Sequence, residues 1–339
     1  MMRRMALVSV LFVVSVLVLA SWGREARSAP DAVTVAQAGK PDLRPVNAAT
    51  ISWGTSSQGG LSYLVGASSA AVLQTRIKNV KFSALVSSGS AENARRIETG
   101  EFQCGQMTSD TAYFAFQGGR EFKEPLKKVR FVTNQWISPE NVIVPRDSPI
   151  KSMADLRGKR ITSTPGWGAT IFAPALLDAA GLKKGDYDMI VLSGSDGAAS
   201  FRDGRVDAAM WAFGVPTATM TELATSKAGI RFIPVDNTIT QVIKTKYPYW
   251  FVSKIPKGAY PGVGEDVPTM ANNNVLLCSA DLPDALVYNM TKVMFLYGKE
   301  IKQSVPAAEA LGTPEMPYQP PIPMHPGAAQ FYREAGLIK

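Results

Sequence analysis

Few residue sets in this sequence could catalyse a reaction. His325 is the only histidine, so a Ser-His-Asp or Cys-His nucleophilic site would have to include it, and it lies in a proline-rich tail. Two distant cysteines and one histidine do not make a usual zinc site. Residues 54–60 are rich in glycine but lack the lysine of a P-loop and the spacing of a dinucleotide fingerprint. We therefore expect no catalytic residues, no metal and no cofactor.

Small hydroxyl residues and glycines could instead hold an anion. In the segment 50–61, Thr50 and Ile51 are typical of a strand, and apolar residues from Leu61 onward recur at helical spacing. The Gly, Ser and Thr residues between them leave N–H groups and hydroxyls uncovered at a helix N-terminus. The helix dipole makes such a position suitable for a carboxylate or phosphate. For this segment alone, a tight turn that binds nothing remains the alternative.

The same arrangement recurs along the chain. Predicted strands at 80–87 and 102–107 end in small-residue loops that open helices at 91–99 and 111–117, and residues 164–170 repeat the pattern before another helix. Repeated strand–helix units imply a parallel sheet with its loops at one carboxyl edge. Open α/β sheets bind their ligands at that edge.

The length of 339 residues favours two domains over one minimal core. We expect an α/β protein in which residues 50–145 and 265–339 form domain I and residues 146–264 form domain II. Strands are predicted at 129–134 and 141–144, with a loop between them. Because the chain crosses between the two units near 145 and 265, we expect two lobes joined by a hinge, with a ligand cleft between them.

Four other segments look different. Residues 1–29 read as a signal peptide, with an arginine-containing start and an apolar run, and cleavage is expected between residues 23 and 38. The Ala- and Pro-rich stretch 30–49 reads as a flexible lead-in. Residues 247–268 look like an irregular connector, and residues 313–326 like an ordered strap. We expect a periplasmic protein, with an uncleaved membrane anchor as the alternative.

The composition is that of a globular protein, with 46% apolar and 19% charged residues. The net charge is +8, but no dense Lys/Arg tract is interleaved with aromatic residues, so we expect no nucleic-acid partner. A mild basic excess suits an anionic small molecule.

Cys104 and Cys278 lie in apolar, strand-like runs. Buried free thiols are common in such runs, and we favour that state. Export also allows a disulfide, which would require Cα atoms within about 7 Å of each other.

Five of the six tryptophans follow the predicted signal peptide, and each falls at a predicted strand end or in a loop near the expected cleft. Large aromatic residues often pack between domains. We nevertheless expect two or three of these rings to line a pocket, because small-molecule sites are mainly apolar with a few placed polar groups. The five are Trp53, Trp136, Trp167, Trp211 and Trp250.

From about residue 50 to the end, the sequence resembles the TAXI-type solute receptors of tripartite ATP-independent periplasmic (TRAP) transporters. The segments that carry the resemblance are 54–60, 88–93, 109–113, 155–160, 203–208, 214–216 and 323–328. The resemblance implies a two-lobed type II periplasmic-binding-protein fold that closes on a small organic acid, by family default glutamate or a dicarboxylate. It also implies delivery of that acid to a TRAP membrane permease, and a structural role for His325. We expect a monomer.

The resemblance places the ligand loops on Thr55, Ser56, Gly59, Gly60, Ser90, Asn93, Ser109, Asp110 and Gly166-Trp167-Gly168-Ala169-Thr170. To these we add Trp53, Gly54, Ser88, Trp136, Trp211, Phe213 and Gly214. The sequence departs from the family pattern at Trp53, Gly166-Trp167-Gly168 and Trp211. These departures favour a carboxylate with an aromatic or branched apolar body over glutamate.

Two alternatives share this interpretation of the fold. A ligand-sensing module that docks on a membrane sensor would have the same cleft and a different partner. An enzyme on the same fold would have to turn over its bound ligand, and we do not expect this protein to be an enzyme.

Overall fold

The computed structural model describes residues 41–165 and 167–339. The predicted signal peptide, its cleavage site, the anchor alternative and the lead-in up to residue 40 lie outside these residues. Across the described ranges, no helix combines the length and the apolar character that a membrane crossing needs.

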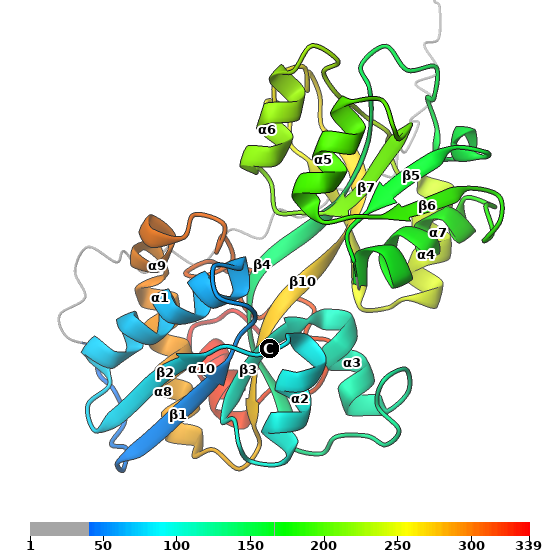
Figure 1. The fold of residues 1–339 in the computed structure, drawn as a ribbon. Helices are drawn as coiled ribbons and strands as arrows, with labels where there is room; N and C mark the ends of the chain where they lie inside the picture. The colour runs from blue at the N-terminus through cyan, green and yellow to red at the C-terminus, as the bar shows by residue number, and fades with distance from the viewer. Residues whose placement is uncertain (1–40, 166) are drawn as a thin grey trace, which may run out of the picture. The chain divides into compact units, whose positions relative to one another are not determined.

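The first strands form the parallel arrangement that the repeated pattern predicts (Figure 1). β1 (Ala49–Gly54) pairs in parallel with β2 (Val80–Leu85) on one side and with β3 (Cys104–Thr108) on the other. The helices that follow these strands are α1 (Leu61–Arg76), α2 (Ser90–Glu98) and α3 (Ser109–Gln117). Since all three strands run in one direction, the three loops share one carboxyl edge.

Two long antiparallel strands, β4 (Val129–Val144) and β10 (Val267–Ser279), run through the sheet and connect its two halves. The prediction of two short strands at 129–134 and 141–144 is wrong, because the chain stays extended through Pro139. Pro139 lies where β4 stops pairing with β10 and begins to pair with β7, so its missing N–H falls at a ladder end.

The second sheet half is built on the other ends of β4 and β10. It contains β5 (Arg160–Ser163), β6 (Asp188–Val191), β7 (Ala208–Ala212), β8 (Arg231–Phe232) and β9 (Trp250–Ile255). β5 pairs in parallel with β6 and β7, and β7 pairs antiparallel with β4. The strand order is β2-β1-β3-β10-β4-β7-β5-β6. The connector predicted at 247–268 is partly wrong, since β9 pairs with the start of β10 there.

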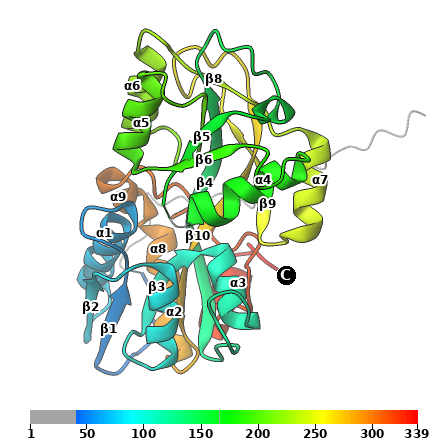
Figure 2. The ribbon, with the colours of Figure 1, turned by 45° about the vertical axis from the view of Figure 1, so that its right-hand side comes forward.

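The helices of the second sheet half lie on both of its faces. In Figure 2, α5 (Gly194–Arg202) and α6 (Ala218–Thr225) lie on one side, and α4 (Ala173–Ala179) and α7 (Asn237–Lys246) on the other. A 3₁₀ turn, η2 (Met153–Leu156), precedes β5, and a π-helical turn, η3 (Gly168–Phe172), runs directly into α4. The helix predicted from residue 171 therefore begins earlier than expected.

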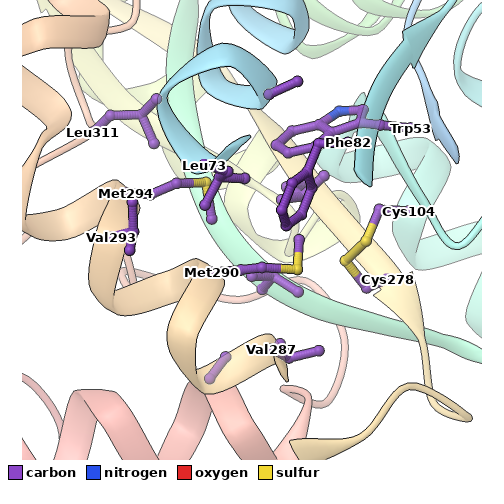
Figure 3. Packing of buried hydrophobic residues seen from close by; sticks show 14 of the residues in the cluster. Trp53, Leu73, Phe82, Cys104, Cys278, Val287, Met290, Val293, Met294 and Leu311 are labelled. Atoms are coloured by element: carbon purple, nitrogen blue, oxygen red, sulfur yellow. A yellow bond between two sulfur atoms is a disulfide. The ribbon is translucent and has the colours of Figure 1, made fainter. Parts of the chain in front are cut away.

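The first sheet half is also covered on both faces. One core joins Trp53 and Ile51 to α1, α8 (Asp284–Leu296) and α10 (Pro326–Glu334), and part of it is shown in Figure 3. The opposite face packs against α2 and α3. α9 (Gly298–Ser304) follows α8. The domain boundaries predicted at 145 and 265 stay a prediction. The two strands that connect the sheet halves, β4 and β10, each take part in both halves.

The tail strap predicted at 313–326 is confirmed by hydrogen bonds along β4. The N–H of Phe131 donates to the carbonyl of Pro323, and the N–H of His325 donates back to the carbonyl of Phe131. The buried His325 accepts a hydrogen bond from the N–H of Gly327 on Nδ1 at 3.2 Å and so caps α10. Burial lowers the pKa of this imidazole.

Cys104 and Cys278 form a disulfide, so the expectation of free thiols is wrong. The two residues are direct partners in the antiparallel pairing of β3 with β10, and their Cα atoms are 3.9 Å apart (Figure 3). Because β10 joins the sheet 174 residues after Cys104, only the folded topology brings the thiols together.

Candidate functional site

Three helices begin at the carboxyl edge of the first sheet half without a side-chain cap. The N-cap residues of α1, α2 and α3 are Gly60, Gly89 and Thr108, and none of them accepts a capping hydrogen bond on its side chain. Their first N–H groups and the positive ends of their dipoles therefore meet at one edge. This is the anion-friendly geometry that the small-residue loops predict.

Several predicted ligand residues hold these loops together. Thr55 donates from Oγ1 to the carbonyl of Leu85 at 2.7 Å, and the carbonyl of Thr55 accepts from Asn93 Nδ2 at 2.7 Å. Asn93 Nδ2 also donates to the carbonyl of Gln106. Thr55 and Asn93 are both buried, and Gly54 packs so closely against Asn93 that a Cβ would lie 2.4 Å from Oδ1.

Other predicted loop residues are more open to solvent. Ser56 and Gly60 are partly exposed, and Gly59 is exposed with a φ of +85°, a conformation that favours glycine. Ser88 is exposed and donates to Glu92 Oε2 at 2.6 Å. Ser90 accepts from the N–H of Thr108 on Oγ at 3.3 Å, which links the second loop to the third.

Asp110 joins α3 to distant parts of the chain. Its side chain is fully buried, and Oδ2 accepts from Arg120 Nη1 at 2.8 Å and also from Trp167 Nε1. Its Oδ1 accepts from Asn272 Nδ2 at 3.1 Å. The neighbouring Ser109 donates from Oγ to the carbonyl of Tyr249 at 2.9 Å. Two predicted ligand residues therefore connect the start of α3 to β10 and to the start of η3.

An aromatic cluster adjoins this junction. Trp167 lies 4.6 Å from Phe172 between ring centroids, Phe172 lies 4.5 Å from Trp250, and Trp250 stacks on Tyr247 at 4.5 Å. Sequence reasoning singled out the tryptophans but missed Phe172 and the tyrosines. The signal for the tyrosines was the run Tyr247-Pro248-Tyr249-Trp250, which lies in the segment interpreted as a connector.

The five tryptophans differ in exposure. Trp53 and Trp211 have no exposed surface, and Trp136 and Trp250 have 5% and 3%. Trp211 stacks on Phe213, which is partly exposed, at 5.4 Å between centroids. Trp167 is also partly exposed, next to the buried Gly168 and Ala169 and the exposed Thr170. The ligand roles predicted for these residues and for Gly214 stay predictions, and Gly166 lies outside the described residues.

Several buried side-chain polar atoms have no hydrogen-bond partner in the part of the chain that the structure describes. Among the described residues, these include Trp53 Nε1, Gln106 Nε2 and Asn93 Oδ1 in the first sheet half. In the second they include both carboxyl oxygens of Glu140, Ser163 Oγ and Trp250 Nε1. Burial raises the pKa of Glu140 well above its usual range. Sequence reasoning missed Glu140 because it lies between the strands predicted at 129–134 and 141–144, in a segment interpreted as a loop.

A hollow of about 840 Å³ lies elsewhere, at the opposite end of β1. Asp42, Arg44, Arg76 and Tyr297 are among its lining residues, and none of the predicted ligand residues contributes to it. Arg44 and Arg76 are engaged in ion pairs with Glu334 and Glu300 respectively. This hollow therefore offers no free cation from these two residues.

The fold is shared with solved binding proteins. A TctC solute binding protein from Polaromonas aligns with a TM-score of 0.52 and 14% identity, over 85% of this chain and 96% of that one. The periplasmic aliphatic sulphonate binding protein SsuA from Escherichia coli aligns with a TM-score of 0.50 and 18% identity, over 84% and 78%. A binding protein component of an ABC phosphonate transporter from Pseudomonas aeruginosa aligns with a TM-score of 0.50 and 11% identity, over 79% and 81%.

These likenesses confirm the predicted two-lobed α/β binding-protein fold. The sequence itself matches one protein family across residues 53–336, which includes both sheet halves and the tail strap. The chain belongs to the NMT1-like family.

Proposed function

We propose that this protein is a periplasmic solute-binding receptor that captures a small organic acid and delivers it to a TRAP membrane permease. The family match and the shared fold support the receptor role. The resemblance of the sequence to TAXI-type receptors supports the permease partner.

The observation that carries the choice of an acid is the set of three uncapped helix N-termini at one sheet edge. Each has N–H groups without a side-chain cap, and the partly exposed Ser56 and the exposed Gly59 lie beside the first of them. A carboxylate placed there gains several hydrogen bonds and three favourable dipoles. Two of the structural relatives are described as binding proteins for sulphonates and phosphonates, which are also anions.

The preference for an apolar or aromatic body rests on the partly exposed Trp167. Its ring stands at the start of η3 and contacts Phe172, so a flat group could stack against an existing aromatic surface. Such stacking is worth about 0.5–1.5 kcal/mol beyond the buried area. The buried Trp53 and Trp211 would support the ligand loops from behind.

Isothermal titration of the purified protein with glutamate, succinate, benzoate and branched carboxylates tests the acid. Matched sulphonates serve as the comparison, because they carry an anion of different shape on the same body. We expect micromolar binding of a carboxylate with an apolar body. Tighter binding of glutamate would contradict the preference for an apolar body. Binding of sulphonates alone would contradict the choice of a carboxylate as the ligand.

Delivery to the permease is tested separately. Uptake of the radiolabelled acid into cells should require both this protein and a TRAP permease pair, and loss of either should abolish it. Normal uptake without the TRAP permease would assign the receptor to a different transporter, and normal uptake without this protein would favour a membrane sensor as its partner.

A further inference from the structure

Glu140 has no hydrogen-bond partner for either carboxyl oxygen among the described residues. Only 1% of the residue is exposed. It lies on β4 directly opposite Ala212, the last residue of β7, where β4 passes from its pairing with β10 to its pairing with β7. This position is the carboxyl edge of the second sheet half, where ligands bind in sheets of this kind.

The side chain of Glu140 points to the face that carries the aromatic cluster. Side chains alternate along a strand, so Glu140 shares a face with Val142 two residues later. Val142 and its partner Met210 belong to the same core as Phe172 and Trp250. Ala212, opposite Glu140, packs against that core as well.

A second unpartnered group lies on this face. Ser163 ends β5 and is fully buried, and its Oγ also has no partner among the described residues. By the same alternation it shares a face with Ile161, which belongs to the same core. Gly168 at the start of η3 covers Ser163, since a Cβ there would lie 3.2 Å from Oγ.

Aromatic side chains span the strands on either side of Glu140. η3 begins beside Ser163 on β5, and its Phe172 reaches Trp250 on β9, which pairs with β10. β4 lies between β7 and β10, and Asn272 on β10 pairs with both Ser138 and Trp250, so Glu140 lies on the same face of the sheet as Trp250. Trp250 Nε1 is buried there too and has no partner in the part of the chain that the structure describes. A carboxyl, a hydroxyl and an indole N–H are therefore left unsatisfied on one face.

Asp110 provides the contrast. It is buried as completely as Glu140, but three side-chain donors satisfy it. A buried acid that serves only the fold is expected to have such partners, because an unpaired buried polar group costs free energy. Glu140 has no such partner within residues 41–165 and 167–339, which points to a donor that comes from outside.

We propose that Glu140 recognises a protonated amine or similar N–H donor on the ligand, with Ser163 as the neighbouring hydrogen-bond group. Glu140 thereby becomes a specificity-determining residue for the end of the ligand opposite its anionic group. The inference rests on the proposed receptor function. It adds that a ligand with a carboxylate but no amine leaves Glu140 and Ser163 without a hydrogen-bond partner.

The test uses trios of compounds that differ in one group. Phenylalanine is compared with 3-phenylpropanoate, which lacks the amine, and with phenethylamine, which lacks the carboxylate. Leucine, 4-methylpentanoate and 3-methylbutylamine form an aliphatic trio. Titration calorimetry is performed on the wild-type protein, on Glu140→Gln and on Glu222→Gln. Glu222 is an exposed acid on α6 that pairs with Arg202, and it serves as the matched control.

We expect the amine-bearing acid to bind wild-type protein at least about tenfold more tightly than its des-amino partner, since a hydrogen bond between charged groups discriminates by about this much or more. Glu140→Gln should remove most of this ratio, and Glu222→Gln should keep it. Equal binding of the two acids, or an unchanged ratio in Glu140→Gln, would overturn the inference.

The third compound separates this inference from the proposed function. If phenethylamine or 3-methylbutylamine binds in a Glu140-dependent manner while no carboxylate does, the inference holds and the organic-acid function fails. If only the des-amino acids bind, the function holds and the inference fails. If no member of either trio binds, the inference is rejected, and the organic-acid function is decided by the titrations with glutamate, succinate and benzoate.

Discussion

At the scale of single residues, partner satisfaction separates side chains that stabilise the fold from side chains available for a ligand. Thr55, Asn93 and Asp110 are buried and bonded to other parts of the chain. Glu140 and Ser163 are buried and unbonded among the described residues. The sequence pattern had selected Thr55, Asn93 and Asp110 as ligand residues and had not selected Glu140 or Ser163.

Glu140 should make the stability of the ligand-free protein fall as the pH rises. Burial raises the pKa of this carboxyl in the folded state, whereas an unfolded chain ionises it near pH 4.3. Between that pH and the folded-state pKa, only the unfolded state loses the proton, so unfolding becomes more favourable. Glu140→Gln should therefore raise the free energy of unfolding at pH 8 more than at pH 4.5.

Urea denaturation at the two pH values measures this difference, with Glu222→Gln as the exposed control. A Glu140→Gln protein that is equally affected at both pH values would show that the carboxyl titrates normally.

Trp167 should stabilise the junction between α3 and η3 through its indole N–H. Trp167→Phe keeps an aromatic ring but removes the hydrogen bond to the buried Asp110. Hydrogen bonds to charged groups contribute about 1.5–3 kcal/mol, so we expect a loss of this size. Trp250→Phe is the matched control, because its Nε1 has no partner among the described residues. Urea denaturation should show a smaller loss for Trp250→Phe, and equal losses would contradict the role of the hydrogen bond.

At the scale of elements, β10 does more than complete a sheet. It pairs with β3, β4 and β9, carries half of the disulfide, and supplies Asn272 to Asp110. Local patterns recovered the start of each unit well, because each strand and its helix are adjacent in the sequence. β10, the strand that pairs with these units, comes much later in the sequence.

The disulfide between β3 and β10 should contribute substantially to stability. It closes a loop between residues 174 positions apart, and natural disulfides typically contribute about 2–5 kcal/mol. The double variant Cys104→Ala/Cys278→Ala should lose about this much free energy of unfolding. Denaturation with and without reductant provides the check, since reductant should weaken the wild-type protein and leave the variant unchanged. Equal stability of the wild-type protein and the variant in the absence of reductant would contradict the prediction.

At the scale of the whole molecule, β4 and β10 are the strands that run through both sheet halves. Their pairing is interrupted by register shifts next to Asn274 and Leu276. Such irregularities bend a strand and mark where a ladder can flex. We place the predicted hinge at this pair of strands.

A ligand that closes the two halves should make the protein more compact. Small-angle scattering with and without a ligand identified by calorimetry should show a smaller radius of gyration when the ligand is bound. The double variant Gly59→Ala/Gly60→Ala, altered in the first ligand loop, should lose both the binding and the compaction. An unchanged radius at saturating ligand would argue against a hinged receptor.

The sequence by itself determined the α/β class, the parallel strands at 50–107 and the small-residue loops at their carboxyl edge, because these depend on neighbouring residues and on side-chain periodicity. Tertiary structure decided whether β4 continues through Pro139, whether Cys104 meets Cys278, and which polar side chains find partners. Each of these depends on strands that are distant in the sequence. Asp110 accordingly finds Arg120 nearby in the sequence and Trp167 and Asn272 far from it, while the carboxyl of Glu140 has no partner among the described residues.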